Sequence, residues 1–364
     1  MNDFKAEPDS LRRAMLDAVE RVFDSGWYVL GNEVVNFENN WASTCGAEFA
    51  VGTANGMDAL EISLRALGIG EGDEVVTTSM TAFATVLSIL RTGATPVLAD
   101  IDLSTGLLCM ESAARCISRK TKAIVLVHLY GQVRAMGAWL AFCESNGVHL
   151  VEDCAQAHLA KSEGRMAGSF GIMAAFSFYP TKNLGAVGDA GLITTSSKEL
   201  ADKAKQLRNY GQSIRYHHPV VGLNSRLDEI QAAILSVRLG TLSEYTIRRR
   251  TIANYYDEQL TNQFVSKMSA PDEPSAHVYH LYILQTDFRQ QLQDHLLSHG
   301  IQTFIHYPIP IHHQKPCLTC RRDPEGLTNS ERHAETCISI PCHPQLSSDD
   351  LHYIAETINS FQAE

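Results

Sequence analysis

The 364-residue chain lacks a basic run, a long apolar stretch and any low-complexity tract. Its formal net charge is −11, which argues against the electrostatic footprint of a nucleic-acid-binding protein. No apolar stretch approaches the roughly 20 residues that span a bilayer. The N-terminus lacks the charged-then-apolar order of a signal peptide. We therefore expect a cytoplasmic protein with no membrane and no nucleic-acid partner.

The nine cysteines are odd in number and scattered along the chain, which predicts reduced thiols and not a disulfide framework. Cys317, Cys320, Cys337 and Cys342 are one possible zinc set. The segment between the last two is apolar and extended, whereas zinc ligands usually come from tight turns with glycine or polar residues. We favour the interpretation without structural zinc.

Short apolar segments alternate with amphipathic ones from residue 49 onward. The expected strands are 49–52, 74–78, 95–99, 123–128, 149–153, 174–178 and 190–194. The expected helices are 9–25, 34–41, 59–67, 85–91, 110–117, 136–145 and 227–260. This rhythm predicts an α/β fold with a mainly parallel, seven-stranded sheet. In such sheets the functional residues collect at the carboxyl ends of the strands.

The pattern changes after Pro271. Strands are expected at 277–284 and 302–307, and helices at 289–299 and 347–360. These elements predict a smaller α+β domain. We expect the large domain to span residues 1–240 and the small domain to span residues 241–364, a length that lets each bury a core.

Lys182 follows the expected strand 174–178, and Asp153 ends the expected strand 149–153. A lysine and a carboxylate at neighbouring strand ends are the pair that pyridoxal 5′-phosphate requires. The lysine forms an imine with the cofactor, and the carboxylate keeps the pyridine nitrogen protonated. Glu152 precedes Asp153, and strand alternation places the two on opposite faces. We favour Asp153 as the cofactor partner.

Three further groups fit the same cofactor. Gly56, in an Asn-Gly turn before a helix, allows close backbone approach, and the helix start offers free N–H groups to a phosphate. Ser177 would add a hydroxyl to that phosphate. Gln156 is placed to hydrogen-bond the phenolic oxygen of the cofactor. An Asn-Gly turn alone is a weak signal, because most such turns bind nothing.

Two loops hold the remaining polar candidates. Asn224 and Arg226 lie in a glycine-marked loop before a long helix, where helix capping is the alternative interpretation. His306, Tyr307 and His312 lie in a proline-rich segment with three histidines. Two prolines make that segment rigid, and no carboxylate accompanies the histidines in sequence. We therefore favour a substrate-contacting loop over a metal site.

Taken together, these residues resemble the DegT/DnrJ/EryC1/StrS family of sugar aminotransferases, which have fold type I among pyridoxal-phosphate enzymes. The resemblance covers nearly the whole chain. The matching segments are Gly26-Trp27-Tyr28-Val29-Leu30-Gly31, Asn55-Gly56-Met57-Asp58-Ala59-Leu60, Val151-Glu152-Asp153-Cys154-Ala155-Gln156, Ser177-Phe178-Tyr179-Pro180-Thr181-Lys182-Asn183-Leu184, Gly222-Leu223-Asn224-Ser225-Arg226-Leu227 and His306-Tyr307-Pro308.

The resemblance implies roles for individual residues. Lys182 and Asp153 are the catalytic pair, and Gln156 contacts the ring oxygen. Gly56, Met57 and Ser177 hold the phosphate, whereas Asn224 reaches the phosphate of a neighbouring subunit. The active unit implied is a homodimer with a shared site. The expected substrate contacts are Tyr179, Arg226, His306, Tyr307 and His312.

The chain also departs from the family pattern. Ala82 stands where relatives carry an aromatic residue that stacks on the cofactor ring. Many relatives have Ser-Gly-Thr at residues 55–57, and the Asn-Gly form resembles the branch that aminates C3 of nucleotide-linked keto-deoxysugars. One branch replaces the lysine with histidine and performs dehydration, and Lys182 argues against membership of that branch.

The sequence thus predicts an aminotransferase that moves an amino group from L-glutamate to a nucleotide-linked keto-deoxysugar, at C3. Two alternatives remain open. One is a pyridoxal-phosphate enzyme that aminates another ketone, such as a C4 keto-sugar or a keto-cyclitol. The other is a catalytically silent regulatory homologue.

Overall fold

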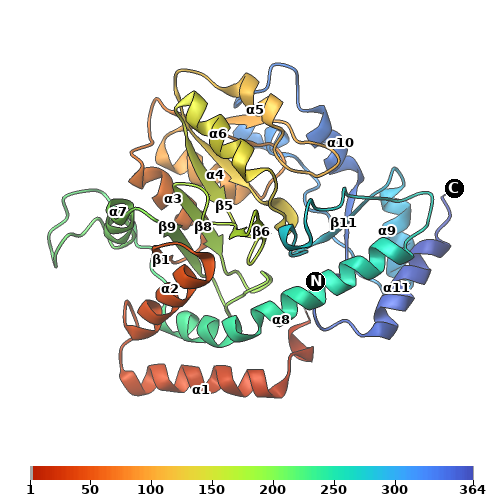
Figure 1. Cartoon of the computed structure of the whole chain (residues 1–364), viewed down its shortest axis with the longest axis horizontal. Coiled ribbons are helices and arrows are strands. Elements are labelled where there is room, and N and C mark those ends of the chain that lie inside the picture. The colour runs from red at the N-terminus through yellow and green to blue at the C-terminus, as the bar shows by residue number, and fades with distance from the viewer. Residues whose placement is uncertain (1–2, 364) are drawn as a thin grey trace.

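A computed structural model describes residues 3–363 as a large sheet covered by helices, with a smaller sheet beside it (Figure 1). The large sheet has eight strands. In spatial order they are β1 (Phe49–Thr53), β9 (Gly191–Thr195), β8 (Met173–Ser177), β5 (His149–Asp153), β4 (Thr121–Val127), β2 (Glu74–Thr78), β3 (Thr95–Ala99) and β12 (Arg321–Arg322). β9 alone runs in the opposite direction to the other seven strands, so its pairings with β1 and β8 are antiparallel. The α/β fold with a mainly parallel sheet is confirmed.

The seven expected strands are all present, and the eighth is a correction. β12 comes from the C-terminal part of the chain and pairs with β3, so that Arg321 lies opposite Val97. A two-residue strand has no alternation to detect, which is why the sequence does not reveal it. The residues of this edge strand belong to the expected small domain.

Two apolar cores lie on the two faces of the large sheet. One face is covered by α2 (Asn32–Cys45), α5 (Met110–Cys116) and α6 (Met136–Asn146). The other face is covered by α3 (Gly56–Ala66), α4 (Phe83–Thr92) and α7 (Lys198–Arg208). Because helices cover both faces of the sheet, most side chains along the strands are apolar. The polar groups of the site are left to the strand ends.

The long helix α8 (Glu229–Gln259) runs from the large sheet to the smaller unit (Figure 1). α1 (Asp9–Ser25) packs along its first half, with Ala18 and Val22 against Ala233. Its second half contributes Ile252 and Tyr256 to the core of the smaller unit. The expected boundary at residues 240 and 241 falls inside this continuous helix, so the division into two domains stays a prediction.

The smaller unit has an antiparallel sheet in the order β10 (Ser266–Lys267), β11 (Tyr282–Gln285) and β13 (Cys337–Ile340). Its helices are α9 (Arg289–Ser298), α10 (Thr328–Thr336) and α11 (Ser348–Ser360). A short hairpin, β6 (Lys161–Ser162) and β7 (Arg165–Met166), forms a separate two-stranded sheet. Among the described residues, no helix has both the length and the apolar character needed to cross a bilayer.

Of two strand predictions for this unit, one was right only for its last three residues and the other was wrong. The expected strand 277–284 begins only at Tyr282, because Tyr279 has a φ of 44° and turns the chain. The expected strand 302–307 is not a strand, since Phe304 makes only an isolated bridge to Ser339. The first segment instead contacts the large unit, where the amide of Val278 donates to the carbonyl of Gly131 (2.9 Å), whereas the second stays beside β13 through Phe304 alone.

Candidate active site

The structure brings Lys182 and Asp153 to adjacent strand ends. Asp153 is the last residue of β5, and Lys182 follows β8 by a short turn in which its amide donates to the carbonyl of Tyr179 (2.8 Å). The two strands pair in parallel, with Asp153 opposite Ala175. The carboxyl ends of parallel strands meet at one edge of the sheet, so both side chains lie at the same edge.

The surroundings of Lys182 make its amine more reactive. Part of the Lys182 side chain reaches solvent, but the protein packed around it keeps most water away from the amine. This desolvation lowers the pKa of Lys182 to about 8. The negative charge of Asp153 acts in the opposite direction. An ordinary lysine has a pKa of about 10.4 and is almost wholly protonated near neutral pH. Lys182 therefore supplies far more neutral, nucleophilic amine than a surface lysine does.

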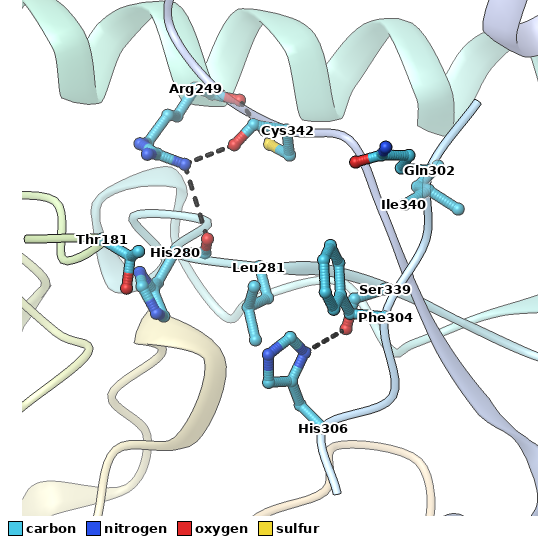
Figure 2. Close-up of a pocket in the computed structure, with 10 residues that line it drawn as sticks. All are labelled: Thr181, Arg249, His280, Leu281, Gln302, Phe304, His306, Ser339, Ile340 and Cys342. Carbon is cyan, nitrogen blue, oxygen red and sulfur yellow. Dashed lines mark hydrogen bonds between the residues drawn. The ribbon is translucent and has the colours of Figure 1, made fainter. Parts of the chain in front are cut away.

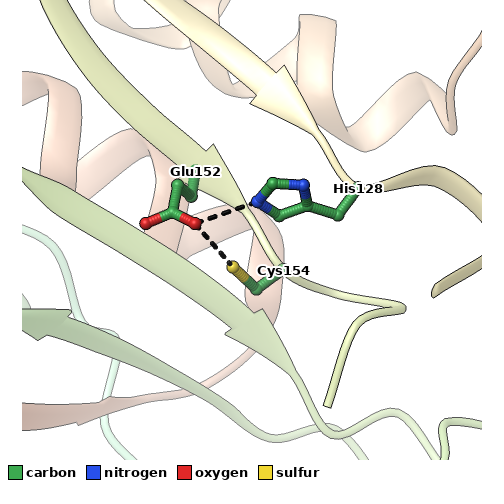
Figure 3. Close-up of side chains that lie close together, drawn as sticks. All are labelled: His128, Glu152 and Cys154. Atoms are coloured by element: carbon green, nitrogen blue, oxygen red, sulfur yellow. Dashed lines mark hydrogen bonds and ion pairs between the residues drawn. The ribbon is translucent and has the colours of Figure 1, made fainter. Parts of the chain in front are cut away.

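The two acidic residues at the end of β5 have different surroundings. Asp153 accepts hydrogen bonds from the Thr85 hydroxyl (2.9 Å) and the amide of Ala155 (3.1 Å). Glu152 points to the opposite face, where it lies 2.9 Å from the ring of His128 and near Cys154 (Figure 3).

The carboxylate of Glu152 also accepts three backbone N–H groups, from Gly168, Phe170 and Gly171, each at 2.8 Å. Burial alone would raise the pKa of Glu152, but the hydrogen bonds from His128 and from Gly168 and Gly171 lower it. Glu152 is thus fully engaged in holding the 168–171 loop. Of the two acidic residues, Asp153 is the one on the face of Lys182.

The start of α3 lies against the end of β8. A Cβ added to Gly56 would lie 2.6 Å from the Cβ of Ser177, so only glycine allows this approach. Asn55 caps the helix by accepting from the amide of Asp58 (2.8 Å). The first N–H groups of a helix have no partner within the helix, and they favour an anion. The structure thus places Gly56, Met57 and Ser177 around one helix start.

Gln156 and Tyr307 face each other beside Asp153. The side-chain oxygen of Gln156 accepts from the amide of Tyr130 (2.6 Å), which fixes the amide group. Its nitrogen donates to the hydroxyl of Tyr307 (3.3 Å). Burial, reinforced by the charge of Asp153, raises the pKa of Tyr307 to about 12. Tyr307 therefore stands, as a neutral phenol, next to the cofactor-binding candidates.

His306 lines a small cavity of about 50 Å³ together with Thr181 and His280 (Figure 2). Its Nδ1 lies 2.8 Å from the hydroxyl of Ser339. Burial, together with the charge of Lys182, lowers the pKa of His306 to about 4. Arg249 enters the same cavity from α8 and donates to the carbonyl of Cys342. His306 is therefore a neutral imidazole close to the lysine.

His312 has both ring nitrogens engaged. Its Nδ1 lies 2.6 Å from the hydroxyl of Ser79, and its Nε2 lies 3.0 Å from Oε1 of Glu331. No carboxylate lies beside these histidines in sequence, but α10 brings Glu331 to them in the fold. With both nitrogens engaged, His312 anchors the loop to the large sheet, and its role as a substrate contact stays a prediction.

The remaining candidates lie nearer the surface. Tyr179 and Asn224 are exposed, and Arg226 is half-buried with its guanidinium 5.3 Å from the ring centre of Tyr210. Ala82 is the residue that precedes α4, and its methyl group offers no ring to stack on a cofactor.

Two residues of the site were not singled out from the sequence. Thr85 holds Asp153 from α4, and Thr81 lies 2.9 Å from the Thr85 hydroxyl. Asn183 ties the turn after Lys182 to the smaller unit, since it donates to the carbonyl of Val278 (3.2 Å) and lies 3.1 Å from His280. A threonine inside a helix and an asparagine in a turn carry no pattern that reveals these partners.

The donor set fits pyridoxal phosphate. A lysine with a lowered pKa, a carboxylate on the same sheet edge and a glycine-opened helix start are the three features that this cofactor requires. His158 packs against Trp41, and burial together with the charge of Lys182 lowers the pKa of His158 to about 3. The neutral imidazole of His158 therefore adds little positive charge near Lys182.

Comparison with known proteins adds three results. The sequence pattern of the DegT/DnrJ/EryC1/StrS aminotransferase family matches residues 9–359. The chain is 43% identical over 350 residues, 96% of each chain, to the dTDP-3-amino-3,6-dideoxy-alpha-D-galactopyranose transaminase of Aneurinibacillus thermoaerophilus. It is 42% identical over 347 residues, 94% of this chain and 91% of the relative, to the dTDP-3-amino-3,4,6-trideoxy-alpha-D-glucose transaminase of Streptomyces venezuelae.

A solved structure gives the same result at the level of the fold. The crystal structure of DesV from S. venezuelae, in complex with a ketimine intermediate, superposes with a TM-score of 0.94 at 39% identity. The match covers 98% of this chain and 96% of DesV. The match extends over the large sheet and the smaller unit alike.

Proposed function

The chain belongs to the DegT/DnrJ/EryC1/StrS aminotransferase family, and from that premise we propose that it transfers an amino group from L-glutamate to C3 of a nucleotide-linked keto-deoxysugar. The observation that carries this proposal is the low-pKa Lys182 on the same sheet edge as Asp153. The sugar and the position of amination rest on the names of the two relatives. The glutamate donor rests on the resemblance alone.

Pyridoxal phosphate, when bound, supplies an electron sink that stabilises negative charge on the carbon next to the transferred nitrogen. Lys182 would hold it through Nζ, and Asp153 would hold its ring nitrogen. The start of α3 at Gly56 and Met57, with the hydroxyl of Ser177, would bind the phosphate. Gln156 would donate to the ring oxygen through the nitrogen that now contacts Tyr307.

Lys182 also moves the proton. Its amine, with a pKa of about 8, is close to the ideal for a general base and acid near neutral pH. Nζ accepts the proton that leaves the carbon of the amino donor, and it gives a proton back when the keto-sugar receives the nitrogen. Thr85 and the amide of Ala155 hydrogen-bond the two oxygens of Asp153 and fix the orientation of this carboxylate.

A homodimer with a shared site is part of the same proposal. Large apolar side chains are exposed near Asn224, among them Tyr216 (78% exposed) and Val221 (88% exposed). The segment that carries them projects away from the sheet beyond α7 (Figure 1). A second copy of the chain would cover these side chains and would bring Asn224 toward its cofactor phosphate. Sedimentation velocity tests the dimer, and replacement of Val221 by aspartate should shift it toward the monomer.

The test of the function is spectroscopic. Purified protein should absorb in the visible range of a lysine-bound pyridoxal phosphate, and glutamate should bleach that band. Lys182→Ala should lose this response, with turnover down by at least about 10²-fold, the usual contribution of a positioned acid–base group. A wild-type protein that binds the cofactor but ignores glutamate would support the silent homologue instead. Product analysis with C3 and C4 keto-sugars and a keto-cyclitol separates the remaining alternatives.

A further inference from the structure

Three side chains that can bind a metal converge beside the loop of His306 and Tyr307. His312 and His313 lie in the short helix η4 (Ile311–His313), and Glu331 lies in α10. Oε1 of Glu331 lies 3.0 Å from Nε2 of His312 and 3.6 Å from Nε2 of His313. One ligand atom from each residue lies within 4.8 Å of the other two.

These separations match the edges of a metal coordination sphere. Ligand atoms about 2.1 Å from a tetrahedral Zn²⁺ lie about 3.4 Å apart, close to the two measured distances. The side chain of His312 is 1% exposed, that of Glu331 42% and that of His313 52%, so the cluster opens to solvent on one side. A water molecule can therefore complete the coordination, as in sites with three protein ligands.

The second nitrogen of His312 is also placed as in metal sites. Nδ1 lies 2.6 Å from the hydroxyl of Ser79, which directly follows β2. A ligating histidine normally donates its other N–H to an oxygen, and this bond fixes the ring and its tautomer. If Nδ1 carries the proton and donates to Ser79, Nε2 is left with its lone pair directed at Glu331.

We propose that His312, His313 and Glu331 bind a divalent transition metal, with Zn²⁺ as the ion of the right chemistry. Two imidazoles and a carboxylate suit Zn²⁺ better than Mg²⁺ or Ca²⁺, which prefer oxygen ligands. The bound ion would cross-link η4 to α10. It would thereby fix the loop that carries His306 and Tyr307 against the large sheet.

The other cluster of this kind, His128, Glu152 and Cys154, does not compete (Figure 3). Its three residues are buried, and both oxygens of Glu152 accept backbone N–H groups at 2.8 Å. A metal would have to displace these hydrogen bonds in the interior. At His312, His313 and Glu331 a metal would replace the contacts of these three side chains with one another, and the cluster opens to solvent on one side.

Zinc titration of the cofactor-loaded protein tests the site. The protein is first treated with a chelator and dialysed, and Zn²⁺ is then added in a calorimeter at pH 7.5. The variants are Glu331→Gln and His313→Gln, both at partly exposed positions. The matched control is His352→Gln on α11, where His352 lies 3.2 Å from Glu356 without a third ligand. A Cys317→Ser, Cys320→Ser double variant controls for thiol binding.

The expected result is one Zn²⁺ per chain in the wild type. Each of the two site variants should bind at least ten-fold more weakly, while the His352 variant and the cysteine variant bind as the wild type does. Wild-type protein that takes up no zinc, site variants that bind with unchanged affinity, or loss of binding in the cysteine variant alone would each overturn the proposal. None of these readouts depends on transamination.

Discussion

At the scale of the residue, the main feature of the site is the lowered pKa of the Lys182 amine. Burial favours the neutral form of Lys182, and the charge of Asp153 partly restores the ammonium form. The three histidines near the lysine add little positive charge, because burial keeps His158, His280 and His306 neutral. The imidazoles near the lysine are therefore neutral and can hydrogen-bond without adding positive charge.

The first prediction concerns the titration of Lys182 in cofactor-free protein. Acetic anhydride acylates only neutral amines, so the labelling rate of Lys182 should rise with pH around a midpoint of about 8. Because Asp153 raises the pKa of Lys182, Asp153→Asn should move this midpoint lower. Peptide mass spectrometry over a pH series gives both midpoints, with exposed Lys198 as an internal reference. A Lys182 midpoint equal to that of Lys198 would contradict the desolvation argument.

The second prediction concerns Thr85. A hydrogen bond to a charged group contributes about 1.5–3 kcal/mol, so Thr85→Val should weaken cofactor binding and kcat/KM by roughly 10- to 150-fold. Thr85→Ser keeps the hydroxyl and should retain most of both. Fluorescence titration with pyridoxal phosphate measures the first quantity and steady-state kinetics the second. Equal behaviour of the valine and serine variants would show that the hydroxyl near Asp153 has no such role.

The sequence predicted part of this residue-scale picture. The alternation of β5 separates Asp153 from Glu152, and the structure bears out that separation. The contacts of His312 with Ser79 and Glu331 could not be predicted from the sequence, because these partners are 233 and 19 residues away. Contacts over such separations are fixed by the packing of whole elements and leave no local pattern.

At the scale of the element, the closest approach is that of α3 to β8. Gly56→Ala would put a Cβ 2.6 Å from that of Ser177, so the helix start must shift. We expect a loss of about 1–3 kcal/mol of unfolding free energy, together with weaker phosphate binding. Urea unfolding measures the first effect, and competition between inorganic phosphate and the cofactor measures the second.

Gly240 provides the matched control for Gly56. It lies inside α8 with no heavy atom within 4 Å of an added Cβ. Gly240→Ala should therefore stabilise the protein by about 0.5–1 kcal/mol, because alanine favours the helix. A destabilised Gly240 variant would point to a contact on this face that the isolated chain does not have, such as a second copy.

Most elements could be predicted because their periodicity is strong. α7 and α10 were not, although α7 shows Leu200, Ala204 and Leu207 at helical spacing. The failures at 277–284 and 302–307 have different physical causes. In the first segment Val278 donates to the carbonyl of Gly131 instead of to a neighbouring strand. In the second, only Phe304 pairs with β13, through Ser339, so no ladder forms.

At the scale of the whole molecule, buried neutral histidines make the fold sensitive to acid. Burial lowers the pKa of His158 and of His277 to about 3. In the unfolded chain each takes up a proton below about pH 6.5. Each therefore contributes stability that is present above pH 6.5 and is lost as the pH falls toward 3, by about 1.4 kcal/mol per pH unit.

Urea unfolding between pH 7.5 and pH 4.5 checks this prediction. The unfolding free energy should fall as the pH falls. His158→Gln should reduce the slope of unfolding free energy against pH by about 1.4 kcal/mol per pH unit, the contribution of one bound proton. The exposed His352→Gln serves as the comparison. A slope that His158→Gln leaves unchanged would mean that other groups account for the acid sensitivity.

The edge strand β12 has a consequence for synthesis on the ribosome. Strands β1 to β9 lie within the first 195 residues, whereas β12 arrives at residues 321 and 322. Until then the edge of β3 has unpaired backbone N–H and C=O groups, which can pair with strands of other nascent chains. The polypeptide therefore completes its main sheet only after residue 322 has been made, and chains truncated before β12 should aggregate more readily than the 364-residue chain.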